Sequence, residues 1–161
     1  MGQRVEQIKQ QIKQAFPGLS LDADFQVTSP RDPSYNCIAW AYQIKGRWMW
    51  PPKEDLPAYL DGVTFWPNDN SSVDVSNFIV AFKEGKGYEL CENAEYEKGF
   101  QKIALYVKEG TTECTHAARQ LTTGLWTSKL GPFEDIQHGS PYTIEGKWYG
   151  KVYCIMKRPF S

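Results

Sequence analysis

The segment HAARQLTTGLWTSKL, residues 116–130, decides the fold class because it predicts a β-hairpin. Two β-rich arms flank Thr122-Thr123-Gly124, and Gly124 can adopt the positive φ that a tight turn requires. A hairpin joins neighbouring antiparallel strands, so this segment predicts an antiparallel sheet in the second half of the chain.

The register of the hairpin decides which residue lies opposite His116. If Leu121 pairs with Leu125, the partner of His116 is Leu130, whereas a two-residue turn would make the partner Gly131. In both registers the chain that leaves the hairpin passes close to His116.

Outward from the hairpin, the sequence predicts helices first and strands last. Further strands are expected near 88–90, 102–107 and 149–156, within a mainly β region at 87–156. This order is typical of an α+β domain, with N-terminal helices packed on an antiparallel sheet of about four to six strands.

Three helices are expected before that sheet. The first lies in 1–18, where Val5, Ile8, Ile12 and Ala15/Phe16 recur at helical spacing and Pro17-Gly18 ends the pattern. The second lies in 34–45 with Ser34 as its N-cap. A third, marked by Val75, Phe78, Ile79 and Phe82, is expected to begin near Ser71 or Ser72 and to end at Gly85. Between the second and third helices, residues 46–72 interleave aromatic side chains with proline and predict a long aromatic loop.

Composition excludes several classes of protein. The chain has 161 residues, 41% of them hydrophobic, and a formal net charge of −1. That is enough apolar surface for one folded domain spanning 1–161, and too little charge for a nucleic-acid or membrane-surface partner. Four cysteines are too few for a disulfide scaffold, and neither a signal peptide nor a transmembrane segment is visible. A cytoplasmic location is expected, while secretion by a non-Sec route stays open.

Cys37 is the candidate nucleophile. It lies in the first turn of the second predicted helix, where free amides and the helix dipole stabilise a thiolate. The alternative is a small buried hydrophobic residue, because its neighbours Ile38, Ala39 and Trp40 are apolar.

A cysteine nucleophile needs a base, and the chain has two histidines. His116 is preferred because it lies on a predicted strand, whereas His138 is expected in an exposed loop. Asp135 follows the hairpin closely enough to orient the imidazole of His116, and Glu134 competes for this role.

The remaining site residues follow from the same hypothesis. Asn36 is a candidate oxyanion donor, or otherwise a residue that only bonds the start of the helix. Aromatic residues would line the substrate cleft: Trp40, Trp48, Trp50 and Trp66. A zinc site built on Cys114 and His116 with Cys91 or Cys154 is the competing chemistry, but the chain lacks a C-x₂-C pair. We therefore expect no metal and no cofactor.

Cys at a helix start followed by His on a later strand resembles the papain-like cysteine hydrolases, including the NlpC/P60 and CHAP amidases. The phrases YNCIAWA (35–41), THAARQL (115–121) and WTSKLG (126–131) also resemble a family of uncharacterised bacterial proteins. The chain departs from the papain pattern, since Arg31 stands where a Gln would serve the oxyanion hole and the orienting Asn is missing.

Three functions are open on this basis. The first is a cysteine-dependent amide hydrolase or acyltransferase, with a Cys37-His116-Asp135 triad acting on an unknown peptide, protein or amide substrate. The second is a non-catalytic protein-interaction or ligand-binding domain in which Cys37 belongs to the core. The third is the same thiol chemistry in a secreted effector or toxin.

Overall fold

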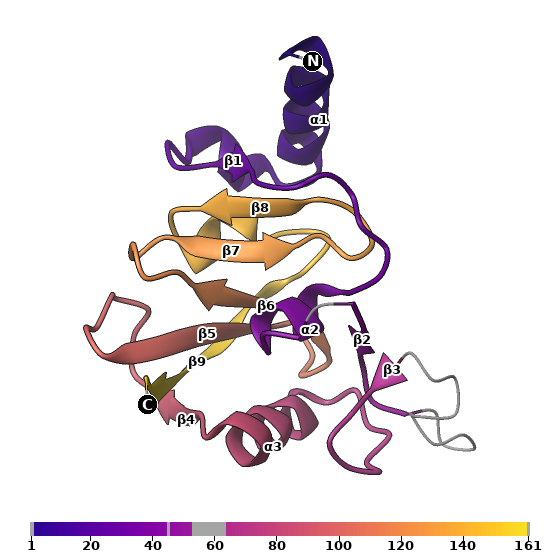
Figure 1. Ribbon diagram of the computed structural model, residues 1–161, viewed down its shortest axis with the longest axis vertical. Coiled ribbons are helices and arrows are strands. Elements are labelled where there is room, and N and C mark those ends of the chain that lie inside the picture. Colours follow the sequence, from indigo (N-terminus) through magenta and orange to yellow (C-terminus); the bar gives the residue numbers. More distant parts are fainter. Residues whose placement is uncertain (1, 45, 53–63, 161) are drawn as a thin grey trace.

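The computed structural model describes residues 2–44, 46–52 and 64–160 (Figure 1). Its helices are α1 (Gly2–Ala15), α2 (Cys37–Ala41) and α3 (Val75–Lys86), with 3-10 turns η1 (Pro17–Leu21) and η3 (Pro141–Ile144). Its strands are β1 (Gln26–Val27), β2 (Trp48–Met49), β3 (Thr64–Phe65), β4 (Glu89–Cys91), β5 (Phe100–Val107), β6 (Cys114–Gln120), β7 (Trp126–Lys129), β8 (Asp135–His138) and β9 (Lys151–Pro159).

Seven of these strands form one sheet in the order β1-β8-β7-β6-β5-β9-β4, and every pair in it is antiparallel. The α+β class is therefore confirmed, with more strands than the four to six expected. Alternation along β5 divides the core in two. Ile103 and Leu105 belong to one buried cluster, whereas Ala104 and Tyr106 belong to the other, on the opposite face of the sheet.

The hairpin register agrees with the pairing of Leu121 and Leu125. Arg119 lies opposite Thr127 and Gln120 opposite Trp126, and the amide of Leu121 donates to the carbonyl of Leu125 at 2.7 Å. Gly124 has a φ of 89°, the left-handed conformation that the turn requires.

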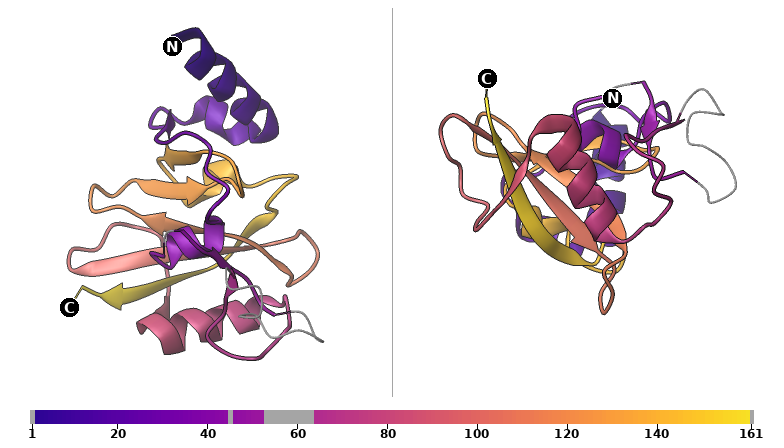
Figure 2. Two further views of the ribbon diagram at one scale, coloured as in Figure 1. Left: turned by 45° about the vertical axis from the view of Figure 1, so that its right-hand side comes forward. Right: turned by 90° about the horizontal axis from the view of Figure 1, so that it is seen from below.

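One face of the sheet is covered by α2 and α3 (Figure 2). Asp74 caps α3 by accepting from the amide of Ser76, and Gly87 ends it with a φ of 78°. The caps therefore differ from the expected Ser71 or Ser72 and Gly85. Gly85 lies inside the helix, where the absence of a Cβ leaves room for the hydroxyl end of Tyr42.

The other face is covered by η1, η3 and the C-terminal end of α1. Ile12 of α1 and Phe16, which follows the helix, are buried there. The rest of α1 extends beyond the edge of the sheet that β1 forms (Figures 1 and 2). No helix among the described residues is long and apolar enough to cross a membrane.

Two further expectations need correction. The segment 135–138, expected as an exposed loop, is strand β8, and His138 is fully buried. The second helix is shorter than 34–45 and has Asn36 as its N-cap, whereas the hydroxyl of Ser34 donates to Asp32. Part of the predicted aromatic loop, residues 53–63, lies outside the described residues; the described remainder includes the parallel pair β2 and β3.

Candidate functional site

Cys37 begins α2, as the sequence predicts. The side chain of Asn36 caps this helix by accepting from the amide of Ala39 at 3.1 Å. The same side chain accepts from the amide of Met49 at 3.0 Å and donates to its carbonyl at 2.9 Å. The hydrogen bonds of Asn36 thus connect α2 to β2. This is the second of the two roles expected for Asn36, that of a residue that bonds the start of the helix.

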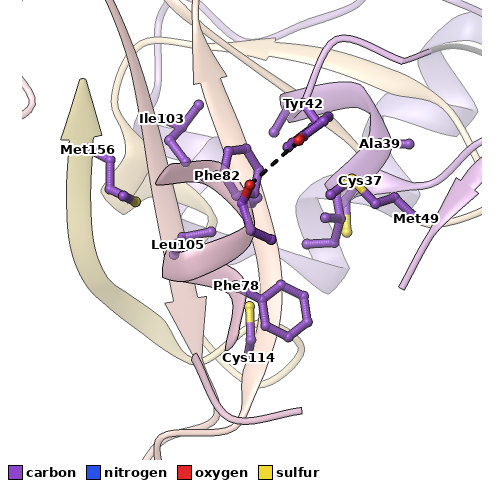
Figure 3. Close-up of a cluster of buried hydrophobic side chains, with 14 of the residues drawn as sticks. Cys37, Ala39, Tyr42, Met49, Phe78, Phe82, Ile103, Leu105, Cys114 and Met156 are labelled. Atoms are coloured by element: carbon purple, nitrogen blue, oxygen red, sulfur yellow. Dashed lines mark hydrogen bonds between the residues drawn. The ribbon is translucent and has the colours of Figure 1, made fainter. Parts of the chain in front are cut away.

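The thiol of Cys37 lies in the core beneath α2. Its exposed fraction is 7%, and it belongs to the cluster that contains Met49 and Phe78 (Figure 3). Burial raises the pKa of Cys37 to about 11, although the backbone amides of Ala117 and Ile38 pull it down. The helix start therefore does not make this cysteine a thiolate at neutral pH.

His116 lies on the opposite face of the sheet from Cys37. Ala117, the next residue of β6, belongs to the cluster that contains Cys37, and successive strand residues point to opposite faces. His116 is instead the cross-strand partner of Tyr106 in β5. Its ring stacks on that of Tyr149, with ring centroids 3.9 Å apart. The sheet thus separates the predicted nucleophile from the predicted base.

The partners of His116 are Ser128 and His138. Nε2 of His116 lies 3.0 Å from Oγ of Ser128, and that oxygen lies 2.8 Å from Nε2 of His138. Nδ1 of His138 lies 2.8 Å from the carbonyl oxygen of Ser140. Burial lowers the pKa of His138 to about 4 and that of His116 well below 6.5, so both rings are neutral at pH 7.

The carbonyl of Ser140 sets the direction of each hydrogen bond in the series that joins His116, Ser128 and His138. A carbonyl only accepts, so Nδ1 of His138 carries the proton and its Nε2 accepts from the hydroxyl of Ser128. Oγ of Ser128 then accepts from Nε2–H of His116. Nδ1 of His116 is left as a buried acceptor without a hydrogen-bond partner among the described residues.

Asp135 lies on the α2 face of β8, away from His116. The hydroxyl of Tyr35 donates to its carboxylate at 3.0 Å, and its strand neighbour Ile136 faces the other cluster. Asp135 shares a face with Cys37, but the structure does not place it where it would orient His116. Glu134, the competing residue, is buried in the loop between β7 and β8.

Lys129 is a fully buried cation on the same face as Asp135. Its Nζ donates to three carbonyl oxygens, those of Asp32 at 2.6 Å, Gly131 at 2.9 Å and Phe133 at 2.5 Å. An ammonium group has three donors, so all of them are used. Lys129 thereby fixes the 130–134 loop to the segment that precedes α2.

The predicted cleft tryptophans anchor the core and its loops. Trp40 donates to Thr127 at 3.0 Å, and Trp48 donates to the carbonyl of Pro33 at 2.6 Å. Trp50 and Trp66 pack edge-on against Phe78, with centroids 5.3 and 4.9 Å away. Within the described residues, no group of three or more His, Cys, Asp or Glu side chains could hold a metal ion.

A groove of about 980 Å³ lies elsewhere, between α1 and the loops at 130–134 and 148–149. Apolar side chains of α1 form one wall: Val5, Ile8, Ile12 and Ala15. The loops contribute the aromatic side chains of Phe133 and Trp148, which are 47% and 59% exposed. Arg4 and Arg31 also line the groove and are exposed.

The sequence predicted the helix that forms one wall of this groove, but it did not predict the groove. The helical spacing of Val5, Ile8 and Ile12 predicted an apolar stripe, but it did not show that Trp148 faces that stripe. Ser128 and His138 were missed as partners of His116. The alternation of Trp126, Ser128 and Leu130 along one face of the hairpin, in the register that sets Leu130 opposite His116, is the signal that would have indicated Ser128 as a neighbour of His116.

A family model described as a domain of unknown function (DUF7689) matches residues 26–157. The match covers most of the chain, so the protein belongs to this family; it is not a match to a papain-like family. Neither a curated protein nor a solved structure matches the chain. The matched residues begin at β1 and leave α1 outside.

Proposed function

We propose that this protein is a non-catalytic binding domain whose ligand site is the groove between α1 and the 130–134 loop. The groove carries the proposal, because it combines concave shape, apolar walls and exposed aromatic side chains with the exposed arginines Arg4 and Arg31. Sites that bind organic ligands or peptide segments share this composition.

The positions of Cys37 and His116 also favour binding over thiol catalysis. A cysteine nucleophile requires a thiolate and a base within hydrogen-bond reach. Here the pKa of Cys37 is raised to about 11, and His116 lies across the sheet in a hydrogen bond with Ser128. Both residues have structural roles in the two halves of the core.

Iodoacetamide should therefore label Cys37 slowly in the folded protein. At pH 8 a thiol with a pKa of about 11 is rarely ionised, so the rate should be about 100-fold below that of a free cysteine. Mass spectrometry would measure the rate at each cysteine, with the partly exposed Cys91 as an internal comparison.

The His116→Ala variant distinguishes this proposal from the cysteine hydrolase hypothesis. We expect the labelling of Cys37 to stay slow in that variant until the protein unfolds. Rapid labelling of Cys37 in the native protein, with an apparent pKa below that of a free thiol and dependent on His116, would favour the hydrolase instead.

The groove itself can be probed with 8-anilinonaphthalene-1-sulfonate, an aromatic anion that fluoresces in apolar sites. Val5→Asp puts a carboxylate in the groove wall, so we expect its affinity to fall about tenfold, equivalent to about 1.4 kcal/mol. Val80→Asp on α3 is the matched control, because Val80 is 39% exposed, Val5 is 45% exposed, and Val80 does not line the groove.

The control variant should bind the dye within about twofold of the wild-type protein. Circular dichroism and the midpoint of thermal unfolding would verify that both variants are folded. The proposal is refuted if the wild-type protein binds no dye saturably, or if both substitutions weaken binding equally.

A further inference from the structure

The N-terminal half of α1 presents an apolar stripe that the described part of the protein leaves uncovered. Ile12 is buried against the sheet, Ile8 is partly exposed and Val5 is 45% exposed, so burial decreases toward the N-terminus of the helix. A helix of 14 residues is only marginally stable alone, because most helical stability in proteins comes from packing. An occupant of the groove would supply that packing.

The dimensions of the groove suit a second helix. The helical wall of the groove runs from Arg4 to Ala15, which is about 17 Å at 1.5 Å per residue, or about three turns. Val5, Ile8, Ile12 and Ala15 follow a spacing of three and four residues, which forms the ridge against which another helix packs. Phe133 and Trp148 offer aromatic anchor points opposite the ridge.

The charges at the groove indicate the chemistry of its occupant. Arg4 and Arg31 are exposed, and the guanidinium of Arg31 lies 5.0 Å from the ring centroid of Phe133. Among the described residues that line the groove, the single carboxylate is that of Glu134, which is buried. A second copy of this chain would bring the same two arginines to the interface, where like charges repel.

We propose that the groove binds an amphipathic helix of a partner protein that carries acidic residues beside its apolar stripe. The apolar side chains of that helix pack between α1 and the aromatic pair Phe133 and Trp148. The carboxylates of that helix pair with Arg4 and Arg31, because the planar guanidinium group can donate two parallel hydrogen bonds to one carboxylate. This inference rests on the proposed function, which makes the groove a ligand site.

Two fluorescein-labelled peptides of about 15 residues test this inference by fluorescence anisotropy with the full chain. Both carry leucine at every third or fourth position; one has glutamate and the other lysine at the flanking positions. At low ionic strength we expect the glutamate peptide to bind at least about tenfold more tightly than the lysine peptide. The double variant Arg4→Glu, Arg31→Glu should reverse that preference.

The double variant Lys83→Glu, Lys108→Glu is the matched control, because it changes the net charge equally with exposed residues that do not line the groove. It should keep the preference for the glutamate peptide. Equal binding of the two peptides, or equal effects of the two double variants, overturns the inference.

The dye separates failure of this inference from failure of the proposed function. If 8-anilinonaphthalene-1-sulfonate binds in a Val5-dependent manner and the glutamate peptide fails to displace it, the acidic helix is wrong while the groove remains a ligand site. If the dye does not bind, the proposed function fails as well. A dimer in sedimentation experiments that Val5→Asp dissociates would identify a second copy as the occupant and overturn the acidic partner.

Discussion

Acidification from pH 7 to about pH 4 should remove several kcal/mol of the free energy of unfolding, because the protein buries two neutral histidines. Burial lowers the pKa of His138 from 6.5 to about 4, and it lowers the pKa of His116 in the same direction. The unfolded chain binds protons at both residues below about pH 6.5, while the folded protein does not. The unfolded state is therefore favoured progressively as the pH falls through this range.

The contribution of His138 alone should be about 3 kcal/mol, since each pH unit between the two pKa values is worth about 1.4 kcal/mol. It is fully present above pH 6.5, decreases as the pH falls, and levels off below about pH 4. The nearby groups shift the two pKa values in opposite directions. A positive charge on His138 would lower the pKa of His116 further, whereas Asp22 and the carbonyl of Ser140 raise the pKa of His138 and partly offset its burial.

Urea unfolding at closely spaced pH values would measure this dependence. The interval above about pH 5 is diagnostic, because ordinary carboxylates titrate below it and the chain contains two histidines in all. Ser128→Ala is the companion variant: it removes the hydroxyl that joins the two rings, so its stability should be lower at neutral pH. A free energy of unfolding that stays constant between pH 7 and 5 contradicts the assignment of two neutral buried rings.

The parts of the fold that the sequence predicted are those with strong local patterns. The hairpin was predictable because Gly124 marks its turn and both arms are β-rich, and α1 and α3 were predictable from their apolar spacing. Strand β8 was missed because three of its four residues are polar. Their burial depends on distant partners, such as Tyr35 for Asp135 and Ser128 for His138, which no local window contains.

The position of Cys37 at a helix start was predictable, but its relation to His116 was not. The choice between the two faces of β6 depends on which neighbours are large, and His116 is followed by two alanines that fit either face. A register shift in the pairing of β5 and β6, between Tyr106 and Val107, further interrupts the alternation before His116. The groove could not be predicted either, because its walls come from segments far apart in the sequence, within 4–16, 27–31, 130–134 and 148–149.

Replacing Lys129 with methionine should lower the free energy of unfolding by about 3 kcal/mol, because it leaves three carbonyl groups without their shared donor. Methionine keeps an unbranched apolar side chain, so the loss reflects the ammonium group, whose Nζ also lies 4.7 Å from the ring centroid of Tyr35. Lys83→Met, at an exposed position of α3, is the control, and its free energy of unfolding should stay within about 0.5 kcal/mol of the wild-type value.

Because Lys129 also holds the carbonyls of the 130–134 loop, dye binding in the groove should weaken in parallel with stability. Lys129→Arg keeps the charge but not the fit to three carbonyls, so an intermediate loss is expected if methionine prevents folding. Urea unfolding that gives Lys129→Met the same stability as Lys83→Met would show that the carbonyls find other donors, and that the loop is not held by this cation.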